Sequence, residues 1–277
     1  MDRERGAVSS ERDRAVSEVV GYVIIMGIII TSISIAYVNG FPALQDVRNQ
    51  ERQDSVASAF SVMGDNIREL TTGGSVKRQT EMNLIGDSLG VDPNRRSWIH
   101  VSITTPSDTE LCNRSCNVSI DPIVYENSAG GLTNPRAPGP SSSQVTIDQI
   151  IYENGAVIRD PGGNGSGMRD EPDWVVEEDG VIINIIQTRG SNTVTGEGTF
   201  SVLTTHSSSN SLVEVDEDEE LDVTVTVGTE SPTAWELYME STEDADSVSR
   251  NGDKVTMYVN DTRKVIKKKT VVDAEAR

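Results

Sequence analysis

The sequence predicts an α+β protein in which a long N-terminal helix, residues 16–74, precedes a β-rich domain, residues 75–277. Three observations predict this class. Residues 19–38 form an apolar run without a charged side chain, residues 44–70 repeat apolar positions at helical spacing, and short β-branched segments recur from residue 75 onward. A chain of 277 residues has room for an anchor and one domain, or for two small domains.

The apolar run begins directly after Glu18, and no further charge occurs until Asp46. Crossing a hydrocarbon core takes about 20 apolar residues, so residues 19–38 are expected to span a membrane. Residues 1–15 carry four arginines, and basic residues beside a span keep that end of the chain in the cytoplasm. We therefore expect a cell-membrane protein with one span, its N-terminus inside and its C-terminal domain extracellular.

The predicted helix changes character after the span. Gly40-Phe-Pro42 predicts a kink or a short unwound turn, because proline lacks an amide donor. Beyond it the helix is expected to resume as an amphipathic segment, whose apolar positions are Leu44, Val47, Val56, Ala59, Phe60, Met63, Ile67 and Leu70. Thr71-Thr-Gly-Gly74 supplies a C-terminal stop.

The amphipathic face needs a cover, and β-structure is expected to provide it. The expected strands are residues 75–89, 98–104, 144–152, 156–159, 174–176, 181–188, 199–205, 221–227 and 254–259. Asn154-Gly155 predicts a hairpin turn between two of them. A short helix is expected over residues 231–240, with Ser231 as its cap, Pro232 in its first position and Trp235, Tyr238 and Met239 turned inward.

Composition restricts the partners. The formal charge is -20 and the pI is near 4.4, which argues against a nucleic-acid partner, because phosphate binding needs clustered basic residues. Only six of the 24 cations are lysines. An acidic, lysine-poor composition resembles that of halophilic proteins, in which strong net charge maintains solubility at high salt. An ordinary acidic surface is the alternative.

Two cysteines, Cys112 and Cys116, are too few for a zinc site of four ligands, and neither histidine has a spacing that would complete one. A small disulfide loop in an oxidising compartment fits better. Four asparagines open glycosylation sequons, all downstream of the span: Asn113, Asn117, Asn164 and Asn260. This distribution agrees with an extracellular domain.

No group of residues predicts catalysis, a metal or a cofactor. The acidic run at residues 214–222 lacks the spacing of a calcium loop and is expected to be a solvated turn. His100 lies in a strand-like run and His206 in a serine-rich turn, neither beside a nucleophile motif. The basic residues 263–269 could meet an anionic surface, but a solvated edge strand guarded by lysines is favoured. We expect a protein that is not an enzyme.

Arg14-Ala15-Val16-Ser-Glu-Val-Val-Gly21 and the apolar helix after it resemble the class III signal of archaeal, especially haloarchaeal, type IV pilin-like proteins. The resemblance implies that a prepilin peptidase cuts between Ala15 and Val16. It covers about a tenth of the chain. Glu18 would be the third mature residue here, whereas bacterial type IV pilins carry their glutamate at the fifth. Two later stretches, Gly-Gly-Ser-Val-Lys-Arg and residues 151–158, are similar to segments of haloarchaeal pilin-like proteins.

The resemblance implies a subunit, or a minor subunit, of an extracellular filament with a role in adhesion or surface structure. Its partners would be like subunits or other pilins. Gly21 and Gly27 are small residues that allow close helix packing, and Glu18 is a candidate for a contact with a neighbouring subunit. The alternative is a monomeric, single-span binding or adhesion module that does not polymerise.

Overall fold

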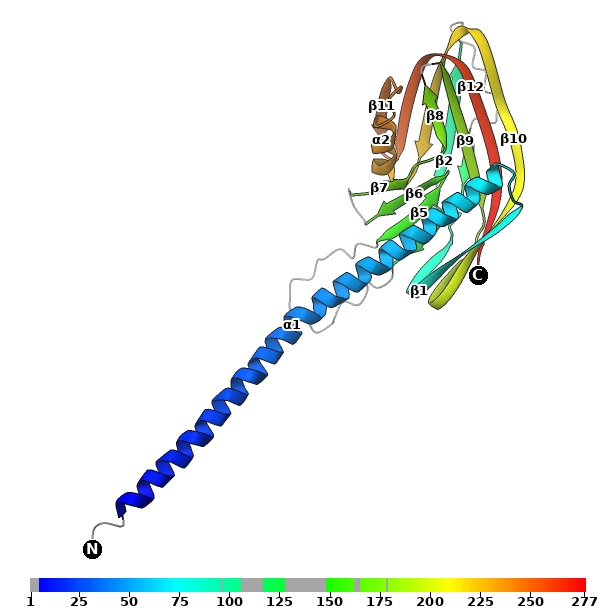
Figure 1. The fold of residues 1–277 in the computed structure, drawn as a ribbon. Coiled ribbons are helices and arrows are strands. Elements are labelled where there is room, and N and C mark those ends of the chain that lie inside the picture. The colour runs from blue at the N-terminus through cyan, green and yellow to red at the C-terminus, as the bar shows by residue number, and fades with distance from the viewer. Residues whose placement is uncertain (1–4, 96, 106–116, 128–147, 162–164, 178) are drawn as a thin grey trace. The chain divides into compact units, whose positions relative to one another are not determined.

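The computed structural model describes residues 5–95, 97–105, 117–127, 148–161, 165–177 and 179–277. Figure 1 shows a long helix, α1, followed by a β-rich domain that also contains the short helix α2. This order confirms the α+β class. The elements are α1 Arg5–Thr71, β1 Lys77–Val91, β2 Ser97–Thr104, β3 Asn117–Ile120, β4 Ile123–Glu126, β5 Gln149–Glu153, β6 Ala156–Asp160, β7 Gly167–Asp170, β8 Trp174–Glu177, β9 Gly180–Arg189, β10 Thr193–Gly228, α2 Pro232–Glu240, β11 Ser247–Asn251 and β12 Lys254–Ala276.

The chain divides into two compact units, Met1–Asp54 and Ser55–Arg277. The last turns of α1 therefore belong to the β-rich unit. The expected unwound turn at residues 40–42 is not formed, because α1 is continuous through them. Proline removes only its own amide donor from the helical ladder, and the hydrogen bonds on either side of it can still form.

The C-terminal part of α1 is buried on one side. Its core residues recur at alternating intervals of four and three, which keeps them on one helix face: Val56, Phe60, Met63, Ile67 and Leu70. None of these side chains is more than 3% exposed, whereas Val47 is 53% exposed. The amphipathic prediction is thus confirmed from Val56 onward, and Val47 is not a core residue.

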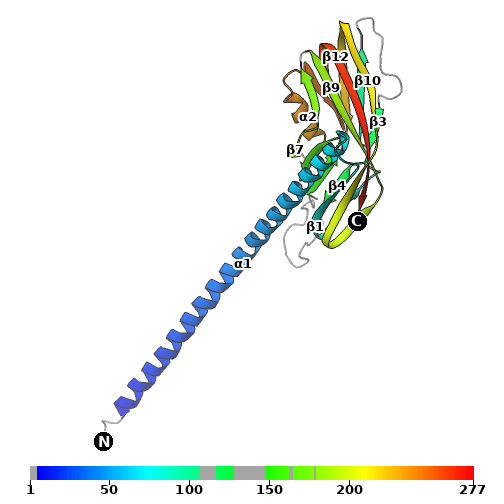
Figure 2. The same cartoon turned by 45° about the vertical axis from the view of Figure 1, so that its right-hand side comes forward.

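The helix ends as its glycines predict. Gly73 has a φ of 81°, in the left-handed region that favours glycine, and the Gly74 amide donates to the Glu69 carbonyl at 3.2 Å. The chain then turns into β1, so that the helix end and the sheet lie side by side within the second unit (Figure 2).

The sheet has 12 strands among the described residues, in the order β7-β6-β5-β4-β1-β10-β12-β9-β8, with β11 on β12, β2 on β10 and β3 on β2. All pairs are antiparallel except β12 with β9, which is parallel. Because a β-strand is pleated, each strand contributes alternate residues to opposite faces of the sheet.

The hairpin β5–β6 shows how this alternation builds two cores. Asn154 and Gly155 have φ angles of 49° and 85°, so the predicted turn is confirmed with the positive φ values that a type I′ turn requires. Ile150 and Tyr152 pack in the cluster that contains the end of α1, whereas Ile151 packs in the cluster that contains α2. Both faces of this hairpin are therefore buried.

The longest strands, β10 and β12, correct two expectations. The acidic run is not a turn, because β10 is a single strand from Thr193 to Gly228. Its register with β12 shifts between Asp216 and Leu221, which face Lys264 and Thr262 respectively. Four residues on β10 thus stand against one on β12, and this bulge lets the strand continue while the closely spaced acidic residues leave the regular ladder.

The lysine-rich segment is not a solvated edge strand, because β12 lies between β10 and β9. Lys267 is 0% exposed, and burial, together with the charge of Lys269, lowers the pKa of its ammonium group to about 8. In the register, Lys264 stands opposite Asp216, whereas Lys267, Lys268 and Lys269 stand opposite Val213, Ser211 and Asn210. The segment is therefore internal to the sheet, and Lys264 is the one lysine in it that is paired with an acidic residue of β10.

The remaining expectations hold in part. All nine predicted segments contain strand, but residues 199–205 and 221–227 belong to one strand, and β3, β4, β7 and β11 were not predicted. Helix α2 begins after Ser231 with Pro232 in its first turn, and Trp235 and Met239 are buried as expected. The Ser231 hydroxyl does not cap the helix. It donates instead to Asp160 Oδ2 at 2.9 Å.

Candidate functional site

The apolar part of α1 is the feature that most needs a partner. Val19–Tyr37 has a mean hydropathy of 2.4, none of it is buried, and it is long and apolar enough to cross a membrane. Its large side chains are exposed all round the helix, from Met26 at 43% to Tyr22 at 66%. A helix that is apolar on every side requires lipid or other protein around it.

Hydroxyl groups in this segment are satisfied within the helix. Thr31 Oγ1 donates to the Gly27 carbonyl at 2.7 Å, and Ser32 and Ser34 each donate to the carbonyl four residues earlier at 2.8 Å. Such bonds remove the cost of placing a free hydroxyl in hydrocarbon. The segment can therefore enter an apolar phase despite its polar residues.

Two tyrosines lie near the ends of the apolar segment. Tyr22 and Tyr37 are each 66% exposed and are 15 residues apart by subtraction of their numbers. At a rise of about 1.5 Å per residue this separates them by about 22 Å along the helix. Aromatic residues of this kind are enriched where a span meets the two membrane surfaces.

The residues expected to mediate processing and packing are placed as follows. The structure places Ala15, Val16 and Glu18 within helix α1. Their side chains lie outside the described part of the structure. A Cβ atom added at Gly21 or Gly27 would meet no atom within 4 Å. Both glycines therefore present open backbone that another helix could approach closely.

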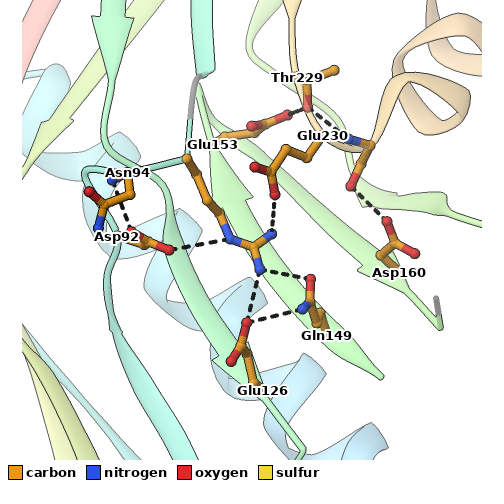
Figure 3. A network of polar contacts seen from close by, with 10 residues as sticks. Asp92, Asn94, Glu126, Gln149, Glu153, Asp160, Thr229 and Glu230 are labelled. Atoms are coloured by element: carbon orange, nitrogen blue, oxygen red, sulfur yellow. Dashed lines mark hydrogen bonds and ion pairs between the residues drawn. The ribbon is translucent and has the colours of Figure 1, made fainter. Parts of the chain in front are cut away.

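In the β-rich unit, Arg95 is the centre of a polar cluster that includes Asp92, Glu126, Gln149 and Glu230, which Figure 3 labels. Arg95 lies in the turn between β1 and β2, where Asp92 Oδ1 accepts a bond from the Asn94 amide at 2.9 Å. The Arg95 side chain is only 12% exposed and forms ion pairs with Asp92, Glu126 and Glu230 at 3.7, 2.9 and 3.1 Å. It also donates to Gln149 Oε1 at 3.0 Å. One guanidinium thus ties together four parts of the domain.

Glu153 lies next to this cluster and is buried (Figure 3). Its Oε1 accepts bonds from Thr229 Oγ1 at 2.6 Å and from Trp235 Nε1 at 2.5 Å. Burial raises the pKa of its carboxyl group, and the bonds from Thr229, Trp235 and Ser97 oppose this shift only in part. The carboxyl group joins β5 to the start of α2 and has the character of a structural anchor.

We expect Glu153→Gln to stabilise the domain relative to the wild type as the pH rises. The folded-state pKa of Glu153 lies above its ordinary value of 4.5, so the stability it contributes is present below that value and is lost as the pH rises through the folded-state pKa. Glutamine does not ionise, and its amide oxygen can still accept both bonds. Urea unfolding followed by tryptophan fluorescence at about pH 4 and about pH 7 measures the difference.

Glu240→Gln is the matched control, because Glu240 is exposed on α2. The free energies of unfolding of the wild type and of Glu153→Gln should differ more at the higher pH. The free energy of unfolding of Glu240→Gln should equal that of the wild type at both pH values. A constant difference between Glu153→Gln and the wild type across this range would show that Glu153 does not titrate with a raised pKa.

The other candidate residues are not brought together. Cys112, Cys116, Asn113 and Asn164 lie outside the described residues, while Asn117 and Asn260 are both exposed. Residues of the described ranges include no group of three or more His, Cys, Asp or Glu side chains placed to hold a metal ion.

His206 corrects one expectation and adds a contact. It lies in β10, not in a turn, and its Nε2 is 2.8 Å from Ser209 Oγ. Ser209 Oγ is in turn 3.1 Å from the Thr270 hydroxyl. An activated serine needs a base held by a third group and donors for an oxyanion, and an exposed His–Ser contact alone does not provide these.

The model of a family described as a family of unknown function (DUF7289) matches residues 14–275. No curated protein and no solved structure matches the chain. The matched range includes both the apolar segment and almost all of the β-rich unit.

Proposed function

The chain belongs to DUF7289, a family without a known function, and we propose that it is a membrane-anchored, type IV pilin-like surface protein. In this proposal it serves as a subunit of an extracellular filament. The observation that carries the proposal is the helix α1. One continuous helix holds a fully exposed apolar segment, Val19–Tyr37, and a C-terminal part buried in a β-rich domain.

Two further features support the proposal. The family match begins at residue 14, so the combination of apolar segment and β-rich domain belongs to the family, and residues 1–13 precede it. The residues at this boundary, Arg14-Ala15-Val16, are those that resemble a class III signal. Leader removal by a prepilin peptidase would leave the apolar helix at the mature N-terminus.

Assembly then follows from the chemistry of the apolar segment. In the bilayer its side chains contact lipid, and in a filament they would contact the same segment of neighbouring subunits. Tight helix packing is favoured by small residues, which Gly21 and Gly27 provide on open backbone. The acidic β-rich domain would face the surrounding medium and keep the assembly soluble.

Sequencing the N-terminus of the cellular protein tests this function directly. We expect the mature chain to begin at Val16, and we expect Ala15→Trp to leave the leader attached and to abolish surface filaments in electron micrographs. Ala7→Trp, inside the leader, is the matched control and should be processed normally.

The alternative is a monomeric surface module anchored by the same helix, and the apolar segment alone is compatible with it. A mature chain that begins at Met1 and remains monomeric in detergent would rule out the filament subunit. A chain cut before Val16 that never forms filaments would support the monomeric module.

A further inference from the structure

The described residues include two glycosylation sequons, which differ in how the fold presents them. A sequon needs the asparagine and a hydroxyl group two residues later, because a glycosyltransferase recognises both. The first is Asn117-Val118-Ser119 in β3, and the second is Asn260-Asp261-Thr262 in β12. Asn113 and Asn164 open the other two and lie outside the described residues.

In β3 the strand period places both recognition groups outward. Asn117 and Ser119 are exposed, whereas Val118 and Ile120 are 4% and 2% exposed. Because alternate residues of a strand point to the same side, the amide of Asn117 and the hydroxyl of Ser119 face solvent together.

The position of β3 in the sheet keeps this arrangement fixed. Asn117 is paired with His100 of β2. Among the described strands, β3 pairs with β2 alone. Gln187 Nε2 donates to the Ser119 carbonyl at 2.7 Å and holds the strand through its backbone. Neither contact uses the Asn117 amide or the Ser119 hydroxyl, so a transferase could reach both in the folded domain.

In β12 the same motif is divided between surface and core. Asn260 is exposed, but Thr262 is 0% exposed, so its hydroxyl is hidden from an enzyme once the domain has folded. The Asn260 amide of the main chain also donates to Asp246 Oδ2 at 2.6 Å, which fixes the backbone at this point.

The charge around the second sequon is also unfavourable. Asn260 lines an open hollow together with several carboxylates and one cation: Asp179, Glu220, Glu243, Asp244, Asp246, Asp261 and Arg263. Glycosyl donors of membrane transferases carry phosphate groups, and like charges repel. An anionic donor would therefore approach Asn260 against a predominantly negative surface.

We infer that Asn117 is an N-glycosylation site of the folded domain and that Asn260 is not. The inference rests on the extracellular placement in the proposed function. In the reaction, Asn117 Nδ2 attacks the anomeric carbon of a sugar carried on a lipid phosphate. The new bond joins that nitrogen to the carbon, the bond from the carbon to the phosphate oxygen breaks, the nitrogen loses one proton, and the lipid phosphate leaves with the bonding electron pair. No oxidant or reductant is needed.

Tryptic glycopeptide mass spectrometry of the full chain, purified from membranes of the producing cells, tests the inference. After reduction and alkylation of the cysteines, cleavage at Arg114 and Arg136 isolates Asn117 in a peptide of residues 115–136, separate from Asn113. Cleavage at Lys254 and Arg263 isolates Asn260 in residues 255–263. We expect glycan occupancy of the first peptide to exceed that of the second by about tenfold or more, as the loss of one recognition contact would give.

Matched variants separate recognition from folding. Ser119→Ala should abolish the glycan on residues 115–136, while Ser119→Thr should keep it, and both changes lie at an exposed position. Asn260→Gln should leave the total glycan mass unchanged. An unmodified Asn117, or equal occupancy at Asn117 and Asn260, would overturn the inference.

A protease added to intact cells distinguishes this failure from failure of the proposed function. If the domain is digested from outside and Asn117 carries no glycan, the glycosylation site is wrong and the surface placement stands. If the domain is protected inside the cell and unmodified, both are wrong.

Discussion

Ile28→Arg should remove the chain from the membrane fraction and leave its β-rich domain folded. Ile28 lies at the middle of Val19–Tyr37 and is 60% exposed. An arginine at the centre of a span costs about 2.5–3.5 kcal/mol, and the isoleucine it replaces is favourable there. The expected fall in membrane partitioning is therefore on the order of 100-fold. Quantifying the chain in carbonate-washed membranes and in the supernatant measures it.

Two controls make this result specific. Ile28→Leu keeps the segment apolar and should remain in the membrane. Ile85→Arg makes the same substitution at an isoleucine of β1 that is 50% exposed, and it should also remain in the membrane. Membrane retention of Ile28→Arg at the wild-type level would show that this segment is not the anchor.

The fold of the domain provides an independent check on Ile28→Arg. All three tryptophans lie in the unit Ser55–Arg277, so their fluorescence reports on that unit alone. The urea midpoint of the solubilised variant should equal that of the wild type, because Ile28 belongs to the other unit. A lowered midpoint would mean that the substitution acts by unfolding the domain.

Local patterns in the sequence predicted the parts of the fold that local forces determine. The interval from Val56 to Leu70 identified the buried helix face, and Asn154-Gly155 identified a turn that needs two positive φ angles. Pro232 after Ser231 identified the start of α2. In each case the residues that give the signal are also the residues that form the structure.

Pairing between distant segments could not be predicted in this way. The lysines of β12 predicted a strand at the edge of the sheet, exposed to solvent. In the structure β12 is an internal strand, because β10 pairs along one edge of it and β9 along the other. These neighbours are 36 and 10 residues long. The polar stretch from His206 to Asn210 has no alternation, so β10 was expected as two strands. Its partners on β12 lie 59 to 66 residues later in the chain by subtraction, since Asn210 pairs with Lys269 and His206 with Val272. Local propensity contains no information about that pairing.

The polar cluster was missed for a related reason. Glu153 directly precedes a hairpin turn, where a carboxylate is normally solvated, but in the fold it is buried and is bonded by Thr229 and by Trp235 of α2. Asp92-Pro93-Asn94 is a recognisable turn signal that could have placed Arg95 between two strands. The ion pairs of Arg95 with Glu126 and Glu230 join residues 31 and 135 positions away by subtraction, which no spacing in the sequence reveals.

Trp235→Ala should be the most destabilising single change in the domain. Trp235 is 0% exposed, and its ring centroid lies 5.4 Å from that of Trp174 and 6.1 Å from that of Tyr238. Removing a buried tryptophan typically costs about 3–5 kcal/mol of unfolding free energy. The loss of its Nε1–H also takes one hydrogen bond from the buried Glu153 carboxyl group. Urea unfolding of the full chain in detergent, followed by the remaining tryptophans, measures the effect.

Trp235→Phe separates the ring from its hydrogen bond. Phenylalanine keeps aromatic contact with Trp174 but has no hydrogen-bond donor for Glu153. Trp235→Phe should therefore lower the free energy of unfolding by about 1–3 kcal/mol, which is the value for leaving a buried acceptor without one of its partners. Repeating the substitution in a Glu153→Gln background should reduce that cost, because a neutral amide loses less than a carboxylate when a donor is removed. Equal costs in the two backgrounds would show that the charge of Glu153 does not strengthen the bond from Trp235. A reduced cost would assign part of its effect to the bond with Glu153, and so to the contact that fixes α2 over the β5–β6 hairpin.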